Sequence, residues 1–176
     1  MMTLIIGGSG SGKSAYAEDL IVNRSKGRVK YYIATMKNQD QECEKKVRRH
    51  KSLRKGKGFI TIEQEVNIEE VLKKVKIGEK TALLECISNL TANVMFREDT
   101  ILPKEIVIEK IVKGILLLKQ EFTHLVVVSN NVFEDGVSYD DTTLEYIAAI
   151  GKINESLAAM AEEVVEVVVG IPIFIK

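Results

Sequence analysis

The sequence lacks the features that would assign it to several common classes of protein. It has only two cysteines, Cys43 and Cys86, which lie far apart without metal-ligand spacing, so no disulfide framework is indicated. Basic and acidic residues number 25 each, so the basic excess typical of a dedicated nucleic-acid binder is missing. No apolar run approaches the length that spans a membrane, and no basic leader precedes the first apolar segment. These absences predict a cytoplasmic protein with no membrane span and no nucleic-acid partner.

Short runs rich in β-branched residues alternate with longer segments of helical period. The expected strands cover residues 3–6, 29–34, 59–62, 81–85, 124–129, 164–169 and 171–175. The expected helices cover residues 13–24, 40–54, 68–75, 90–96, 106–122 and 144–161. This order predicts an α/β layer fold with a mainly parallel sheet. Little room for a crossover remains around Gly170 and Pro172, so the last two strands are expected to be antiparallel. Without an internal repeat or a linker, the 176 residues are predicted to form one domain, residues 1–176.

A glycine-rich segment between the first expected strand and helix fits the pattern G-x-x-x-x-G-K-[ST]. Its residues are Gly7, Gly8, Ser9, Gly10, Ser11, Gly12, Lys13 and Ser14. Glycines let the backbone turn tightly and direct several N–H groups at phosphate oxygens, and the helix N-terminus adds its positive end. Lys13 is predicted to reach the β- and γ-phosphates, and the Ser14 hydroxyl to coordinate Mg²⁺. The segment therefore predicts nucleoside triphosphate binding without naming the reaction.

A basic segment surrounds His50. Its cations are Lys45, Lys46, Arg48, Arg49, Lys51, Arg54, Lys55 and Lys57. Composition alone favours a solvated helix face, and a surface for membrane or nucleic acid would lack aromatic anchors. A third interpretation pairs the cations with a second triphosphate. Neighbouring positive charges disfavour imidazolium, so His50 would stay neutral and nucleophilic, and the same charges would stabilise the phosphorus centre that it attacks.

Further short segments follow one another in a characteristic order along nearly the whole chain. After the glycine-rich loop come Tyr32-Ile33-Ala34-Thr35, Arg49-His50-Lys51 with Arg54, Leu83-Leu84-Glu85-Cys86-Ile87, Thr91 with Asn93, Val128-Ser129-Asn130, then Gly151, Asn154, Ala158 and Val167-Val168-Val169-Gly170-Ile171-Pro172. Their order and number resemble the bifunctional adenosylcobinamide kinase/adenosylcobinamide-phosphate guanylyltransferase family.

The resemblance implies a RecA-like P-loop fold and two activities of cobalamin assembly. One phosphorylates the aminopropanol hydroxyl of adenosylcobinamide, and the other transfers GMP from GTP to that phosphate through a guanylyl-histidine. The family's histidine falls on His50. The remaining family positions for nucleotide contact fall on Ile33, Ala34, Thr35, Lys51, Ser52, Leu53, Arg54, Glu63 and Glu85. A carboxylate suits the guanine N1 and amino groups or the ribose hydroxyls, and Glu85 could instead support Mg²⁺ beside Ser14. The resemblance also implies a trimer.

The chain departs from the family pattern mainly between residues 131 and 148. The departures are Asn131, Phe133, Asp135, Ser138 and Ala148, with Gly10 in the phosphate loop. They bear on the acceptor site and leave two alternatives open. One is a P-loop kinase for a different small molecule, and the other is a GTP-binding regulatory protein whose catalysis has decayed. The choice of ATP or GTP as phosphate donor also stays open.

Overall fold

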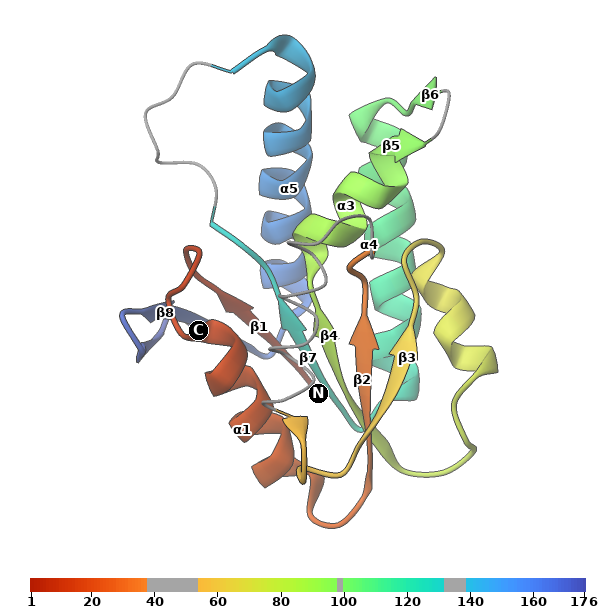
Figure 1. Ribbon diagram of the computed structural model, residues 1–176, viewed down its shortest axis with the longest axis vertical. Helices are drawn as coiled ribbons and strands as arrows, with labels where there is room; N and C mark the ends of the chain where they lie inside the picture. The colour runs from red at the N-terminus through yellow and green to blue at the C-terminus, as the bar shows by residue number, and fades with distance from the viewer. Residues whose placement is uncertain (38–53, 98–99, 132–138) are drawn as a thin grey trace.

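The computed structural model describes residues 1–37, 54–97, 100–131 and 139–176, and Figure 1 shows the arrangement of their helices and strands. The strands are β1 (Met2–Ile6), β2 (Val29–Ala34), β3 (Phe59–Glu63), β4 (Lys80–Glu85), β5 (Phe96–Arg97), β6 (Thr100–Ile101), β7 (His124–Val128), β8 (Glu163–Val168) and β9 (Ile171–Phe174). The helices are α1 (Lys13–Ser25), α3 (Ile87–Met95), α4 (Lys104–Glu121) and α5 (Asp141–Met160), with one 3₁₀ helix, η1 (Ile68–Lys73). None of the helices in these ranges is long and apolar enough to cross a membrane.

Seven strands form one sheet in the order β3-β2-β4-β7-β1-β8-β9. Every neighbouring pair is parallel except β8 and β9, which pair antiparallel through the turn at Val169 and Gly170. The predicted α/β fold and its antiparallel C-terminal strands are thus confirmed. The central strands read as nearly continuous apolar runs because helices cover both of their faces.

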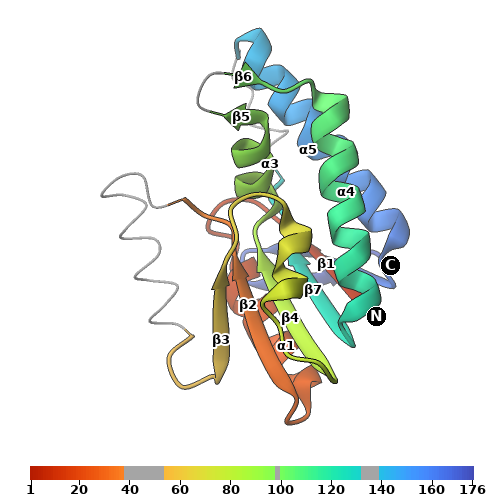
Figure 2. The same cartoon turned by 90° about the vertical axis from the view of Figure 1, so that its right-hand side faces the viewer.

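Alternation along the strands divides the core between these two faces. Leu4, Ile33 and Leu84 belong to a large cluster with residues of α3, α4, α5 and η1. Their neighbours Ile5 and Tyr32 belong to a smaller cluster with residues of α1. Figure 2 shows α4 and α5 together on the side of the sheet that the larger cluster occupies. The core therefore lies in two layers and supports the central strands from both faces.

The carboxyl ends of the central strands are aligned in the sheet. Ile5 of β1 and Glu85 of β4 both lie opposite Val128 of β7, and Ala34 of β2 lies opposite Glu85. The glycine-rich loop and the residues that follow β2, β4 and β7 therefore meet at one edge. In open α/β sheets this is the edge where ligands bind.

Two features differ in kind from the sequence prediction, and one predicted helix stays untested. The short hairpin of β5 and β6 was not expected, because strands of two residues leave no periodic signal. The segment expected as a helix over 68–75 is a shorter 3₁₀ helix. Of the helix expected over 40–54, only Arg54 lies within the described residues.

Candidate active site

The glycine-rich loop connects β1 directly to α1. Gly10 and Gly12 have φ angles of 74° and 92°, a left-handed conformation that glycine adopts without a side-chain clash. Gly12 is the N-cap of α1, and no side chain caps the helix. The first-turn amides of α1 are therefore available to an anion, as the predicted phosphate role requires.

The turn between β8 and β9 packs against the back of this loop. The Gly170 amide donates a hydrogen bond to the Ser11 carbonyl over 2.8 Å. A Cβ added to Gly12 would lie 3.2 Å from the Gly170 Cα, and one added to Gly7 would lie 2.6 Å from the Val167 carbonyl oxygen. Because C=O and N–H point in opposite directions across a trans peptide, holding the Ser11 carbonyl toward Gly170 directs the Gly12 N–H away from that turn.

Lys13 is mostly buried at the start of α1, and its ammonium donates to the Gly8 carbonyl over 3.0 Å. Burial lowers the pKa of Lys13, while the nearby Cys86 and Glu85 act in the opposite direction. The ammonium thus lies across the loop, where the sequence predicts its contact with phosphates.

Ser14 and Tyr32 converge on Glu85 at the end of β4. The Ser14 hydroxyl donates to one carboxylate oxygen of Glu85, and the Tyr32 hydroxyl donates to the other over 2.7 Å. Burial first, and then the Glu85 carboxylate, raise the pKa of Tyr32 far above its usual value, so the phenol stays protonated as a donor. The structure thereby brings together Ser14 and Glu85, the two residues that the sequence proposes for Mg²⁺.

The oxygen atoms of Ser14 and Glu85 suit a hard cation such as Mg²⁺. Within the residues that the structure describes, no three His, Cys, Asp or Glu side chains gather into a metal site. A magnesium ion here would accordingly take few protein ligands and share the others with phosphates and water, as Mg²⁺ commonly does in nucleotide sites.

Thr35 joins the ends of β2 and β4. Its hydroxyl donates to the Cys86 carbonyl over 2.8 Å and accepts from the Cys86 amide over 2.7 Å. Its backbone amide donates to the Glu85 carbonyl, and its own carbonyl accepts from the Asn93 side chain. Thr35 is fully buried, so its polar groups fix the two strand ends relative to each other.

The other residues that the sequence predicts as nucleotide contacts differ in their burial, and some lie outside the described residues. Ile33 is fully buried in the core, and Ala34 is half-buried beside it. Glu63 is exposed at the end of β3, opposite Ala34 in the sheet. His50, Lys51, Ser52 and Leu53 lie outside the described residues.

Arg54 is buried, and its guanidinium carbon lies 3.4 Å from the centroid of the Tyr32 ring. Three residues further on, Lys57 forms ion pairs with Glu18 and Asp19 of α1, at 2.9 and 3.0 Å. The carboxyl-terminal end of the basic segment is therefore attached to β2 and to the helix of the phosphate loop.

The surroundings of Cys86 and His124 do not favour a catalytic role for either residue. Burial raises the pKa of the Cys86 thiol, which disfavours a nucleophilic thiolate. His124 begins β7 opposite Thr81, at the amino ends of the strands and so at the edge away from the phosphate loop. Tyr32, by contrast, received no role from the sequence. Only its place in an alternating strand, on the face that α1 covers, could have indicated that it approaches the loop.

Comparisons with known proteins agree with this arrangement. The family model described as cobinamide kinase / cobinamide phosphate guanyltransferase matches residues 3–175. The bifunctional adenosylcobalamin biosynthesis protein CobU of Escherichia coli (strain K12) is 29% identical over 185 residues, with all of both chains covered. The corresponding protein CobP of Pseudomonas aeruginosa is 25% identical over 177 residues, which cover all of this chain and 98% of that protein.

Among solved structures, one described as an ATPase domain matches with a TM-score of 0.53 at 10% identity. The match covers 94% of this chain and 68% of that one, and it confirms the RecA-like fold. Because the family model spans almost every residue, including the phosphate loop, the chain belongs to the cobinamide kinase / cobinamide phosphate guanyltransferase family of transferases.

Proposed function

We propose that this chain carries out both activities of its family on adenosylcobinamide in cobalamin biosynthesis. In the first, the aminopropanol hydroxyl attacks the γ-phosphorus of ATP or GTP, loses its proton and releases the nucleoside diphosphate. In the second, an imidazole nitrogen of His50 attacks the α-phosphorus of GTP and pyrophosphate leaves. An oxygen of adenosylcobinamide phosphate then attacks the same phosphorus, the N–P bond breaks, and adenosylcobinamide-GDP forms.

The observation that carries the nucleotide half of this proposal is the contact between Ser14 and Glu85 beneath the phosphate loop. A hydroxyl that donates its proton to a carboxylate keeps its lone pairs for a cation. Bound Mg²⁺ would neutralise charge on the β- and γ-phosphates. Gly7, Gly8, Ser9, Gly10, Ser11 and Gly12 would surround those phosphates with backbone amides, and Lys13 would add its ammonium.

The contact with Ser14 favours the metal side of the site for Glu85. Glu63 is then the better acceptor for the guanine N1 and amino groups or for the ribose hydroxyls, since its exposed side chain ends β3 at the same sheet edge. Thr35 would contribute by fixing strand ends, with Ile33 and Ala34 beside it. Lys51, Ser52, Leu53 and Arg54 complete the nucleotide contacts that we propose on the family pattern.

The proposal extends to the whole chain as one domain, residues 1–176, acting in the cytoplasm as a homotrimer. The family pattern supports these points. A P-loop kinase with a different acceptor is the second candidate, because Asn131 and Ala148 depart from the family at positions that bear on the acceptor site. That candidate needs no covalent nucleotide on His50.

Two parallel incubations test the proposed function. Protein, Mg²⁺ and adenosylcobinamide are combined with γ-labelled ATP or GTP, and adenosylcobinamide phosphate is combined with α-labelled GTP. Labelled adenosylcobinamide phosphate and labelled adenosylcobinamide-GDP are the expected products, and both should disappear with Lys13→Ala. Nucleotide binding without either product would contradict the proposal and favour the kinase with a different acceptor or the decayed regulatory protein.

A further inference from the structure

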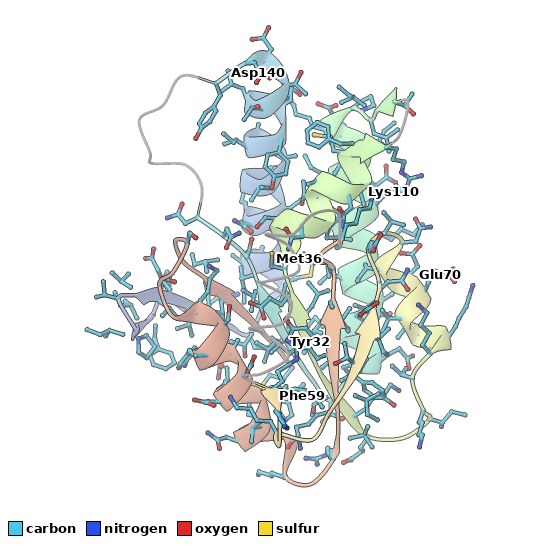
Figure 3. All side chains as sticks on the ribbon, in the orientation of Figure 1. Tyr32, Met36, Phe59, Glu70, Lys110 and Asp140 are labelled. Atoms are coloured by element: carbon cyan, nitrogen blue, oxygen red, sulfur yellow. The ribbon has the colours of Figure 1, made fainter. Side chains whose placement is uncertain are left out.

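Tyr32 is enclosed on several sides at the carboxyl half of β2. It is 3% exposed, and its ring meets Phe59 of β3 edge-on, with 6.2 Å between centroids and an interplanar angle of 79°. Figure 3 shows Tyr32 and Phe59 close together among the side chains beside α1. With Arg54 against the same ring, the direction of the Tyr32 hydroxyl is set by packing.

That hydroxyl is directed at Glu85. Tyr32 donates to one carboxylate oxygen over 2.7 Å, and Ser14 donates to the other. Rotation of the carboxylate would break both hydrogen bonds, so each donor restrains the geometry of the other. Tyr32 therefore fixes the orientation of the Glu85 carboxylate, which accepts the hydrogen bond from Ser14.

The position of the ring depends in turn on residues 54–57. The Arg54 guanidinium stacks on it, and Lys57 is anchored to Glu18 and Asp19 of α1. These contacts connect the carboxyl-terminal end of the basic segment to the residue that holds Glu85. Planarity matters here, because a guanidinium can lie flat on an aromatic face whereas an ammonium cannot.

We propose that Tyr32 is a positioning residue, which holds Glu85 so that Ser14 presents its hydroxyl oxygen to the magnesium ion of a bound nucleoside triphosphate. The inference rests on the proposed nucleotide site and adds a residue that neither the phosphate-loop pattern nor the family assignment gives a role. Tyr32 touches neither the phosphates nor the metal, and acts through Glu85.

The test measures Mg²⁺-dependent binding of a fluorescent GTP analogue to Tyr32→Phe, which loses the hydroxyl and keeps the ring. Tyr31→Phe is the matched control, because Tyr31 precedes it in β2, lies in the core of the other face and uses its hydroxyl to accept from the Lys76 amide. We expect Tyr32→Phe to raise the Mg²⁺ concentration at half-maximal binding about tenfold, the order expected for a lost hydrogen bond to a charged group. Tyr31→Phe should leave that concentration unchanged. Without Mg²⁺, Tyr32→Phe should bind the analogue with the same affinity as wild type.

A double-mutant cycle with Glu85→Gln tests whether the effect passes through Glu85. In that background Tyr32→Phe should change the Mg²⁺ dependence by less than about twofold, because the group it orients is already altered. Equal weakening of binding with and without Mg²⁺ would mean a general structural role and would overturn the inference.

Failure of the positioning role and failure of the proposed nucleotide site give different results. If wild type binds the analogue and Tyr32→Phe shows the Mg²⁺ dependence of wild type, only the positioning role is wrong. If wild type does not bind the analogue at all, the proposed nucleotide site fails and the inference fails with it. Thermal unfolding of each variant shows that the measurements are made on folded protein.

Discussion

The Gly170 amide donates a hydrogen bond to the Ser11 carbonyl, so the turn between the last two strands supports the phosphate loop from behind. This hydrogen bond joins residues from opposite ends of the chain. It makes the shape of the loop dependent on the β8–β9 hairpin as well as on its own glycines.

Gly12→Ala should therefore weaken both folding and nucleotide binding. Alanine in a left-handed conformation costs roughly 1–2 kcal/mol, and the added Cβ would also lie 3.2 Å from the Gly170 backbone. Gly27→Ala is the matched control, since Gly27 has a φ of 83° and nothing within 4 Å of an added Cβ. We expect both variants to have a lower free energy of unfolding by urea, Gly12→Ala by the larger amount, and only Gly12→Ala to lose GTP binding. Equal effects of the two variants on both measurements would contradict the supporting role of the hairpin.

Thr35→Val should separate a structural clamp from a direct nucleotide contact. The change keeps the shape of the side chain but removes both hydrogen bonds to Cys86, which should lower the free energy of unfolding by about 1–3 kcal/mol. Thr61→Val, on the exposed side of β3, should stay within about 0.5 kcal/mol of wild type. Nucleotide affinity, measured well below the unfolding temperature, should change by less than about twofold. A large loss of affinity at unchanged stability would instead indicate that the Thr35 side chain contacts the nucleotide.

Glu162 should make the stability of the protein depend on pH in the acid range. It accepts hydrogen bonds from Lys119, which also pairs with it at 2.8 Å, and from the Met2 amide, and these lower its pKa from 4.5 to about 2. Because the folded pKa is the lower one, the stabilisation is complete above about pH 4.5 and is lost as the pH falls toward 2. The side chain is 47% exposed, so screening by solvent keeps the effect small.

The measurement is the difference in Tm between wild type and Glu162→Gln across that range. It should be positive at pH 6 and shrink toward zero near pH 2. Lys119→Met should reduce the pH dependence in the same way, since it removes the partner of the same pair. A Tm difference that stays constant over the whole range would contradict the assignment.

The sequence predicted those parts of the fold and site that depend on local patterns. Runs such as His124–Val128 predicted buried parallel strands, and the glycine spacing before Lys13 predicted the phosphate loop. The contacts of Tyr32 with Glu85 and Arg54 could not be predicted, because they join residues 53 and 22 positions apart whose proximity depends on sheet order. Strand β7 separates β1 from β4 in the sheet, and no local pattern specifies that order.

The role of His50 is the central claim of the proposed function, and it stays a prediction from sequence and family. The most direct measurement incubates the protein with Mg²⁺ and α-labelled GTP without acceptor, and then isolates the protein. We expect label that is stable to alkali and labile to acid, as for a phosphoramidate, and its absence in His50→Ala. Adding adenosylcobinamide phosphate should discharge the label into adenosylcobinamide-GDP. Label that persists in His50→Ala, or wild type that binds GTP and never acquires label, would contradict the account.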